Sequence, residues 1–129
     1  MEESILRNGP RVWNEYVKQA RAAGNFKPDL YAANLRGADL QGVDLVDADL
    51  RKAILSESYM MTADLRGANL EGAQLCEAYL IRADLANCRL VGADLDGADL
   101  SGADLSGAVL DPAFSRRSVI SDFLTIWPG

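Results

Sequence analysis

A strict five-residue period dominates the sequence. From Leu30 to Leu110 every fifth residue is leucine except Met60, so 16 of these 17 positions are leucine. The residue two before each of them is alanine at 13 of the 17 positions. The four exceptions are small or compact: Pro28, Val43, Ser58 and Cys88. A helix repeats every 3.6 residues and a strand every 2. Neither element, continued through the whole region, would keep these leucines on one face.

Each five-residue unit therefore combines a short extended piece with a turn. The alanine and the leucine are two residues apart, so in an extended piece they share one face, which we expect to point inward. The residue between them and the two residues after the leucine then point outward. By this phase Cys88 is buried and Cys76 is exposed. The two sulfurs face opposite ways, which argues against an internal disulfide.

The repeat units resemble those of the pentapeptide-repeat family. Typical units are Ala-Asp-Leu-Gln-Gly at 38–42, Ala-Asn-Leu-Glu-Gly at 68–72 and Ala-Asp-Leu-Ser-Gly at 98–102. The resemblance implies an all-β solenoid, a right-handed quadrilateral β-helix with four units in each coil. Residues 28–112 would form about four coils. Trp13-Asn14 and the run into Pro28 look like small stand-alone bacterial members of the family, many of them cyanobacterial.

Both ends of the chain depart from the period and predict short helical caps, at 1–27 and 113–129. Repeat proteins need such caps to cover an open core and unpaired strand edges. The first helix would start after Asn8 or Gly9, with Pro10 at its first position, and end at Gly24. Its expected apolar stripe is Val12, Trp13, Tyr16, Val17 and Ala20. The second helix would start at Ser115 or Ser118 and carry Val119, Ile120, Phe123, Leu124 and Trp127.

Composition argues against catalysis and against direct binding of nucleic acid or membranes. The chain has no histidine, so we expect no histidine-based acid–base catalysis, no enzyme activity, no cofactor and no metal. Residues 28–112 carry 15 acidic and 6 basic side chains, whereas the ends carry 4 and 7. An acidic rod repels nucleic acid and anionic membrane. No secretory signal or membrane segment is apparent, so we expect a cytoplasmic protein.

Aspartates form one acidic column on the expected coil surface. Asp44, Asp64, Asp84 and Asp104 are spaced by 20 residues, one in each coil. Stacked carboxylates repel one another unless a charge offsets them. Calcium is one possible bridge. The alternative, which we prefer, is that the family favours Asp or Asn at this position whether or not a metal binds.

An apolar patch is the most interface-like feature of the predicted rod. Tyr59 should stack over Tyr79 and Met61 over Ile81, whereas the neighbouring coils have polar residues at these positions. Cross-strand packing alone is the alternative explanation. We predict a non-catalytic interaction or scaffold module with an unknown protein partner. A homodimer through the C-terminal cap or the Tyr59/Tyr79 face is a further possibility. The runner-up follows from the resemblance: some family members mimic DNA and inhibit gyrase, so this chain would be an acidic mimic acting on a DNA-handling enzyme.

Turn chemistry predicts two kinds of corner. A type II turn needs a positive φ at its third residue, which favours glycine or asparagine. Eight corners have glycine there and one has Asn87. Six others do not, so we predict type I or irregular turns at 46–47, 51–52, 56–57, 61–62, 76–77 and 81–82. A positive φ would be least favourable at β-branched Thr62.

Overall fold

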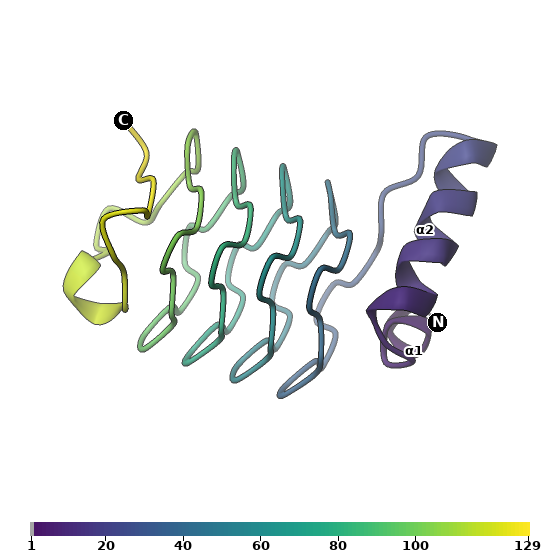
Figure 1. The fold of residues 1–129 in the computed structure, drawn as a ribbon, viewed down its shortest axis with the longest axis horizontal. Helices are drawn as coiled ribbons and strands as arrows, with labels where there is room; N and C mark the ends of the chain where they lie inside the picture. Colours follow the sequence, from purple (N-terminus) through teal and green to yellow (C-terminus); the bar gives the residue numbers. More distant parts are fainter. Residues whose placement is uncertain (1) are drawn as a thin grey trace.

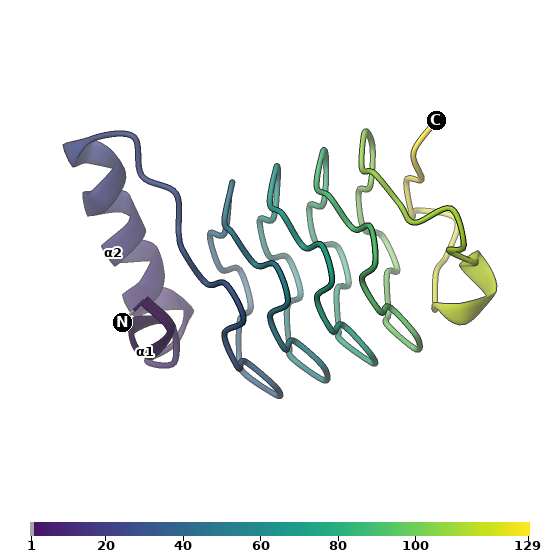
Figure 2. The same cartoon turned by 180° about the vertical axis from the view of Figure 1, so that it is seen from behind.

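The computed structural model describes residues 2–129 as a stack of coils with a different structure at each end. Figure 1 shows helices α1 (Glu2–Leu6) and α2 (Pro10–Ala23) beside the first coil. At the opposite end lies an irregular segment that contains the 3₁₀ helix η1 (Arg116–Ser118). The view from behind shows the same order along the stack (Figure 2). The coils therefore have two distinct ends, one helical and one largely extended.

The coils pair through four ladders of parallel bridges, each normally joining a residue to the one 20 positions later. In residues 2–129 every bridge is isolated, so each side of the coil is only one ladder residue wide. Two ladders run through residues 29, 49, 69, 89 and 109, and through 34, 54, 74 and 94. The other two run through 39, 59, 79, 99 and 120, and through 44, 64, 84, 104 and 126.

The interior of the stack is made of leucine and alanine. Leucines from Leu30 to Leu105, with Met60 in phase, are at most 5% exposed. Alanine or another small residue fills the second inward position, which leaves room for the leucines that converge on the axis. Ser58 occupies one such position, and its buried hydroxyl donates to the carbonyl of Leu55 at 2.7 Å. The inward positions are those that the period indicated.

The two N-terminal helices supply hydrogen bonds that the first coil lacks. In later coils the ladder amides donate to the preceding coil, for example Asp49 to Pro28 at 2.8 Å. In the first coil the amide of Asp29 donates to Glu2 and that of Asn34 to Glu3. The α2 residue Asn14 accepts from the amide of Asp44 at 2.8 Å. Side chains of α1 and α2 thus replace a preceding coil.

The face of α2 that contacts the coil is narrower than its apolar pattern. Trp13 and Val17 are fully buried, and the Trp13 indole donates to the Asp44 carbonyl at 2.7 Å. Val12, which the pattern placed on the same stripe, is 48% exposed. The short helix α1 was not anticipated; its Leu6 is buried in the core.

The prediction of a C-terminal helix over residues 113–129 is wrong. Only η1 is helical there, and Ser115 caps it by accepting from the Arg117 amide. The chain then continues two ladders, with Ile120 bridged to Asp99 and Ile126 bridged to Asp104. The last coil presents unpaired amides along its edge, and an extended segment pairs with them where an isolated helix would not. The amides of Leu100 and Leu105 accordingly donate to Ile120 and Ile126, both at 2.7 Å.

The prediction of two kinds of corner is also wrong. All six corners expected to avoid a positive φ have one: Asp47, Lys52, Glu57, Thr62, Glu77 and Arg82 lie between 57° and 61°. Their amides explain this result, because each donates to a carbonyl of the next coil, as Thr62 does to Ile81 at 3.0 Å. A type I corner would turn that amide out of the stack. Pairing between coils therefore overrides the local preference, at a cost of about 1–2 kcal/mol for each left-handed residue.

Candidate interaction surfaces

Aspartate or asparagine in the ladder position has a local structural role. Its side-chain oxygen accepts a hydrogen bond from the amide two residues later, in the turn. Asp44 accepts from Val46 at 3.2 Å, and Asp84 accepts from Ala86 at 3.1 Å. Asx turns of this kind satisfy a backbone donor that the coil itself leaves unpaired. The recurrence of Asp and Asn therefore needs no metal to explain it.

The acidic column is partly neutralised by arginines. Asp44 pairs with Arg21 of α2, and Asp64 with Arg66 at 2.7 Å. Arg66 also lies 3.8 Å from the Asp84 carboxylate. The hydrogen bond from Arg66 holds the pKa of Asp64 below its usual value. In residues 2–129 no group of three or more His, Cys, Asp or Glu side chains is arranged to hold a metal ion.

Two tyrosines interrupt the polar ladder on one side of the stack. Tyr59 and Tyr79 bridge each other, and their rings lie parallel at a centroid distance of 5.1 Å. They are 44% and 41% exposed, so the stacked pair faces solvent. Met61 and Ile81, at the adjacent turn, are half-buried. The structure therefore brings the two tyrosines together and places the two aliphatic residues beside them.

These tyrosines also replace the residue type that stabilises the turn. On the same ladder Asp39 and Asp99 accept from the amides of Gln41 and Ser101. A tyrosine cannot accept that bond. In the described part of the chain no side chain accepts from the amides of Met61 or Ile81. The stacked pair thus gives up two turn hydrogen bonds that its neighbours keep.

Neither cysteine is an activated nucleophile. Cys88 is fully buried, and this burial raises its pKa to about 12. Desolvation, with a hydrogen bond to Asp94, raises the pKa of Cys76 to about 11. Both thiols are free. At neutral pH almost no thiolate is present at either sulfur.

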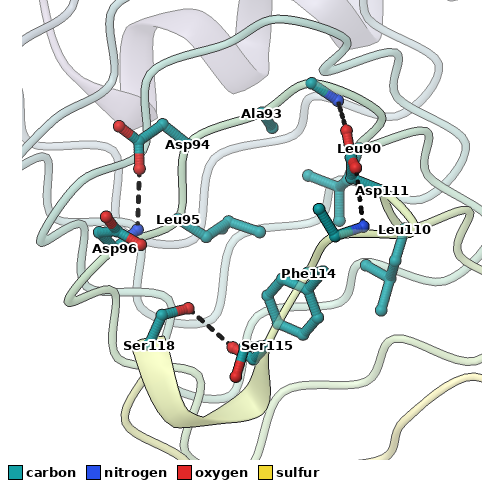
Figure 3. A pocket seen from close by; sticks show the side chains of 12 residues that line it. Leu90, Ala93, Asp94, Leu95, Asp96, Leu110, Asp111, Phe114, Ser115 and Ser118 are labelled. Carbon is teal, nitrogen blue, oxygen red and sulfur yellow. Dashed lines mark hydrogen bonds between the residues drawn. The ribbon is translucent and has the colours of Figure 1, made fainter.

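A groove at the C-terminal end is a feature that sequence reasoning missed. A cavity of about 360 Å³ lies between the last turn of the regular coil and η1 (Figure 3). Leu95 and Phe114 point into it from opposite sides (Figure 3). Its lining is completed mainly by Leu90, Ala93, Asp94, Asp96, Leu110 and Asp111. The signal available in the sequence was the loss of the five-residue phase after Leu110.

Coils of 20 residues stacked through four ladders define the class of the molecule as a β-solenoid repeat protein. The model of the family described as pentapeptide repeats matches residues 29–67, 44–80, 58–97 and 77–111. The chain belongs to the pentapeptide-repeat family, whose solved members imply a right-handed quadrilateral β-helix.

Solved pentapeptide-repeat proteins are similar to the chain over most of its length. One from Nostoc Pcc 7120 is 30% identical with a TM-score of 0.68, and the match covers 84% of this chain and 94% of the Nostoc chain. One from the cyanobacterium Cyanothece 51142 is 36% identical with a TM-score of 0.56, covering 80% and 67%. A thylakoid-lumen protein of Arabidopsis thaliana is 29% identical with a TM-score of 0.67, covering 73% and 67%. No curated protein matches the chain. No helix within residues 2–129 is long and apolar enough to cross a membrane.

Proposed function

We propose that this chain is a non-catalytic protein-interaction module and that a partner contacts the surface formed by Tyr59, Tyr79, Met61 and Ile81. The observation that carries the proposal is the exposed, parallel tyrosine stack. Tyrosine and methionine are enriched where proteins contact one another. A flat aromatic pair offers a large contact area and loses little conformational freedom on binding.

The loss of turn hydrogen bonds supports the same proposal. Replacing Asp or Asn at the ladder position costs a bond that stabilises each coil. Ring stacking offsets part of that cost, by about 0.5–1.5 kcal/mol. Packing alone therefore gives little net benefit over the Asp found on the neighbouring coils. A partner that contacts the exposed rings would offset the remainder.

The ion pairs on the stack favour this role over DNA mimicry. Uninterrupted negative charge is what a duplex mimic needs, but Arg51 forms a bidentate pair with Asp49 at 2.8 and 2.9 Å, and Arg66 pairs with Asp64. These arginines neutralise part of the acidic surface. We further propose that α1 and α2 cap the first coil, because their side chains bond its open edge.

Substitution by asparagine gives a test that spares the fold. Tyr59→Asn with Tyr79→Asn removes both rings and restores the acceptors for the Met61 and Ile81 amides. We expect wild-type stability and at least a tenfold loss of partner recovery in affinity capture from the source organism. Tyr31→Asn is the matched control, because Tyr31 is 48% exposed in a turn on another side of the coil.

Competition distinguishes the two functions in the same capture experiment. Added duplex DNA should leave the captured partner in place if the chain is an interaction module. Release of a DNA-handling enzyme by DNA would support mimicry instead. If wild type and the asparagine double variant capture equal amounts of partner, the tyrosine stack serves only for packing between coils and not for binding.

A further inference from the structure

One of the four ladders is shorter than the other three by one bridged residue, called a rung below. The ladder through Asn34, Ile54 and Gln74 ends at Asp94. On the next two sides the chain supplies a further rung, with Ile120 beyond Asp99 and Ile126 beyond Asp104. At both ends of this side the chain still pairs with the coil, since the Gly92 amide donates to the Asp111 carboxylate at 3.0 Å and the Gly97 amide donates to the Ser118 carbonyl at 2.7 Å. Residues 112–117 between them leave the coil, and the Phe114 amide donates to the Asp111 carbonyl.

The missing rung leaves one donor and one acceptor at the groove. On the earlier coils the amide at each leucine and the carbonyl at each alanine are paired with the following coil, as in Leu75 to Asp94 and Asp94 to Ala73. By the same pattern the Leu95 amide and the Ala93 carbonyl face the groove. Within residues 2–129 neither has a hydrogen-bond partner. These two groups can therefore pair only with solvent or with a molecule that occupies the groove.

The lining of the groove defines the chemistry of its occupant. Leu95, Leu110 and Phe114 provide the large apolar side chains of the lining. Asp94, Asp96 and Asp111 contribute three carboxylates, and no basic side chain is part of the lining. In the described part of the chain none of the three carboxylates forms an ion pair. The groove therefore complements a segment that is both apolar and basic.

We propose that this groove binds an extended segment of a partner protein, which completes the ladder as a strand beside residues 93–96. Strand addition of this kind draws affinity from backbone hydrogen bonds and specificity from alternate side chains. The Leu95 amide would donate to the segment, and the Ala93 carbonyl would accept from it. A cavity of about 360 Å³ suits a few residues.

The register of the coil predicts the pattern of the segment. Its bridging residue would lie outward, opposite Asp94, and is expected to be basic. The residues before and after it would point inward, the first small and beside Ala93, the second apolar and on Leu95. The next residue would lie opposite Asp96 and is again expected to be basic. The predicted pattern is small, basic, apolar, basic, which Ala-Lys-Leu-Arg satisfies.

The test is a titration of the full-length ¹⁵N-labelled chain with the capped peptide acetyl-Ala-Lys-Leu-Arg-amide. We expect a saturable downfield shift of the Leu95 amide proton. The Leu100 amide, already bonded to Ile120 at 2.7 Å, serves as the internal control and should not move. A peptide with serine in place of leucine should bind at least tenfold more weakly. Failure of the Leu95 amide to shift overturns the proposal.

Two pairs of charge-removing variants distinguish binding of the peptide in the groove from general electrostatic attraction to the acidic protein. Asp94→Asn with Asp96→Asn should weaken peptide binding about tenfold, because each substitution removes one cross-strand charge pair. Asparagine at position 94 keeps an acceptor for the Asp96 amide. Asp99→Asn with Asp104→Asn removes the same charge beside occupied rungs and should leave affinity unchanged. Equal weakening by both pairs refutes the site.

Amide hydrogen exchange in the free protein provides a second test of the proposal. In the absence of peptide the Leu95 amide should exchange rapidly with solvent at every protein concentration. If the Leu95 amide is protected from exchange and loses this protection on dilution, a second copy of the chain occupies the groove. If it is protected at all dilutions, the chain's own C-terminal segment occupies it. Either result overturns the proposal. The inference rests on the interaction role proposed above but uses another surface. Failure here leaves the tyrosine test unaffected.

Discussion

Thr62→Gly tests whether the stacked coils hold their corners in an unfavourable conformation. Thr62 has a φ of 58°, and its side chain is exposed. A left-handed L-residue costs about 1–2 kcal/mol, which glycine avoids. Glycine loses more backbone entropy on folding, by about 0.5–1 kcal/mol. The difference is a net stabilisation of about 1 kcal/mol, or a rise in melting temperature of about 4 °C.

Urea unfolding followed by circular dichroism measures this difference, and Gln41→Gly is the matched control. Gln41 precedes the corner residue of the turn one coil earlier and is not among the residues with positive φ in the described chain. The hydrogen bond that the backbone amide of residue 41 donates to the Asp39 carboxylate is kept in the variant. Glycine there brings only the entropic cost, so we expect destabilisation. If both glycine variants lose similar stability, the positive φ at Thr62 carries no strain and the reasoning fails.

Two further predictions concern the inward and outward phase. Leu70→Asp places a charge in the fully buried leucine column and should abolish the circular-dichroism signal of the folded protein. Glu71 points outward, so Glu71→Lys should stay folded with near wild-type stability. Equal folding of the two variants would contradict the assignment of inward and outward positions. Cys76 should react with a thiol reagent faster than buried Cys88, yet more slowly than an exposed thiol of ordinary pKa, because desolvation and the hydrogen bond to Asp94 raise the pKa of Cys76. Asp94→Asn should speed Cys76 alone, and equal native rates for the two thiols would count against this account.

The two proposed interaction surfaces differ in how they could be found from the sequence. The Tyr59/Tyr79 stack follows directly from the 20-residue spacing, since identical ladder positions in successive coils must lie one above the other. The groove does not, because it depends on where the chain goes after Leu110. Only the loss of period there indicates that a ladder could end. Which ladder ends was decided by the path of residues 111–118.

The sequence by itself determined the coil. A five-residue period with leucine and alanine inward admits no ordinary helix or strand, and burial of the in-phase residues from Leu30 to Leu105 follows from hydrophobicity alone. Asp and Asn at the ladder positions act within three residues, so their role is equally local. Tertiary structure decided the corners and the ends. Thr62 and its counterparts adopt a positive φ because their amides must reach the next coil. Residues 119–127, apolar enough to suggest a helix, extend instead because the open edge of the last coil supplies hydrogen-bond partners that the segment's own sequence does not contain.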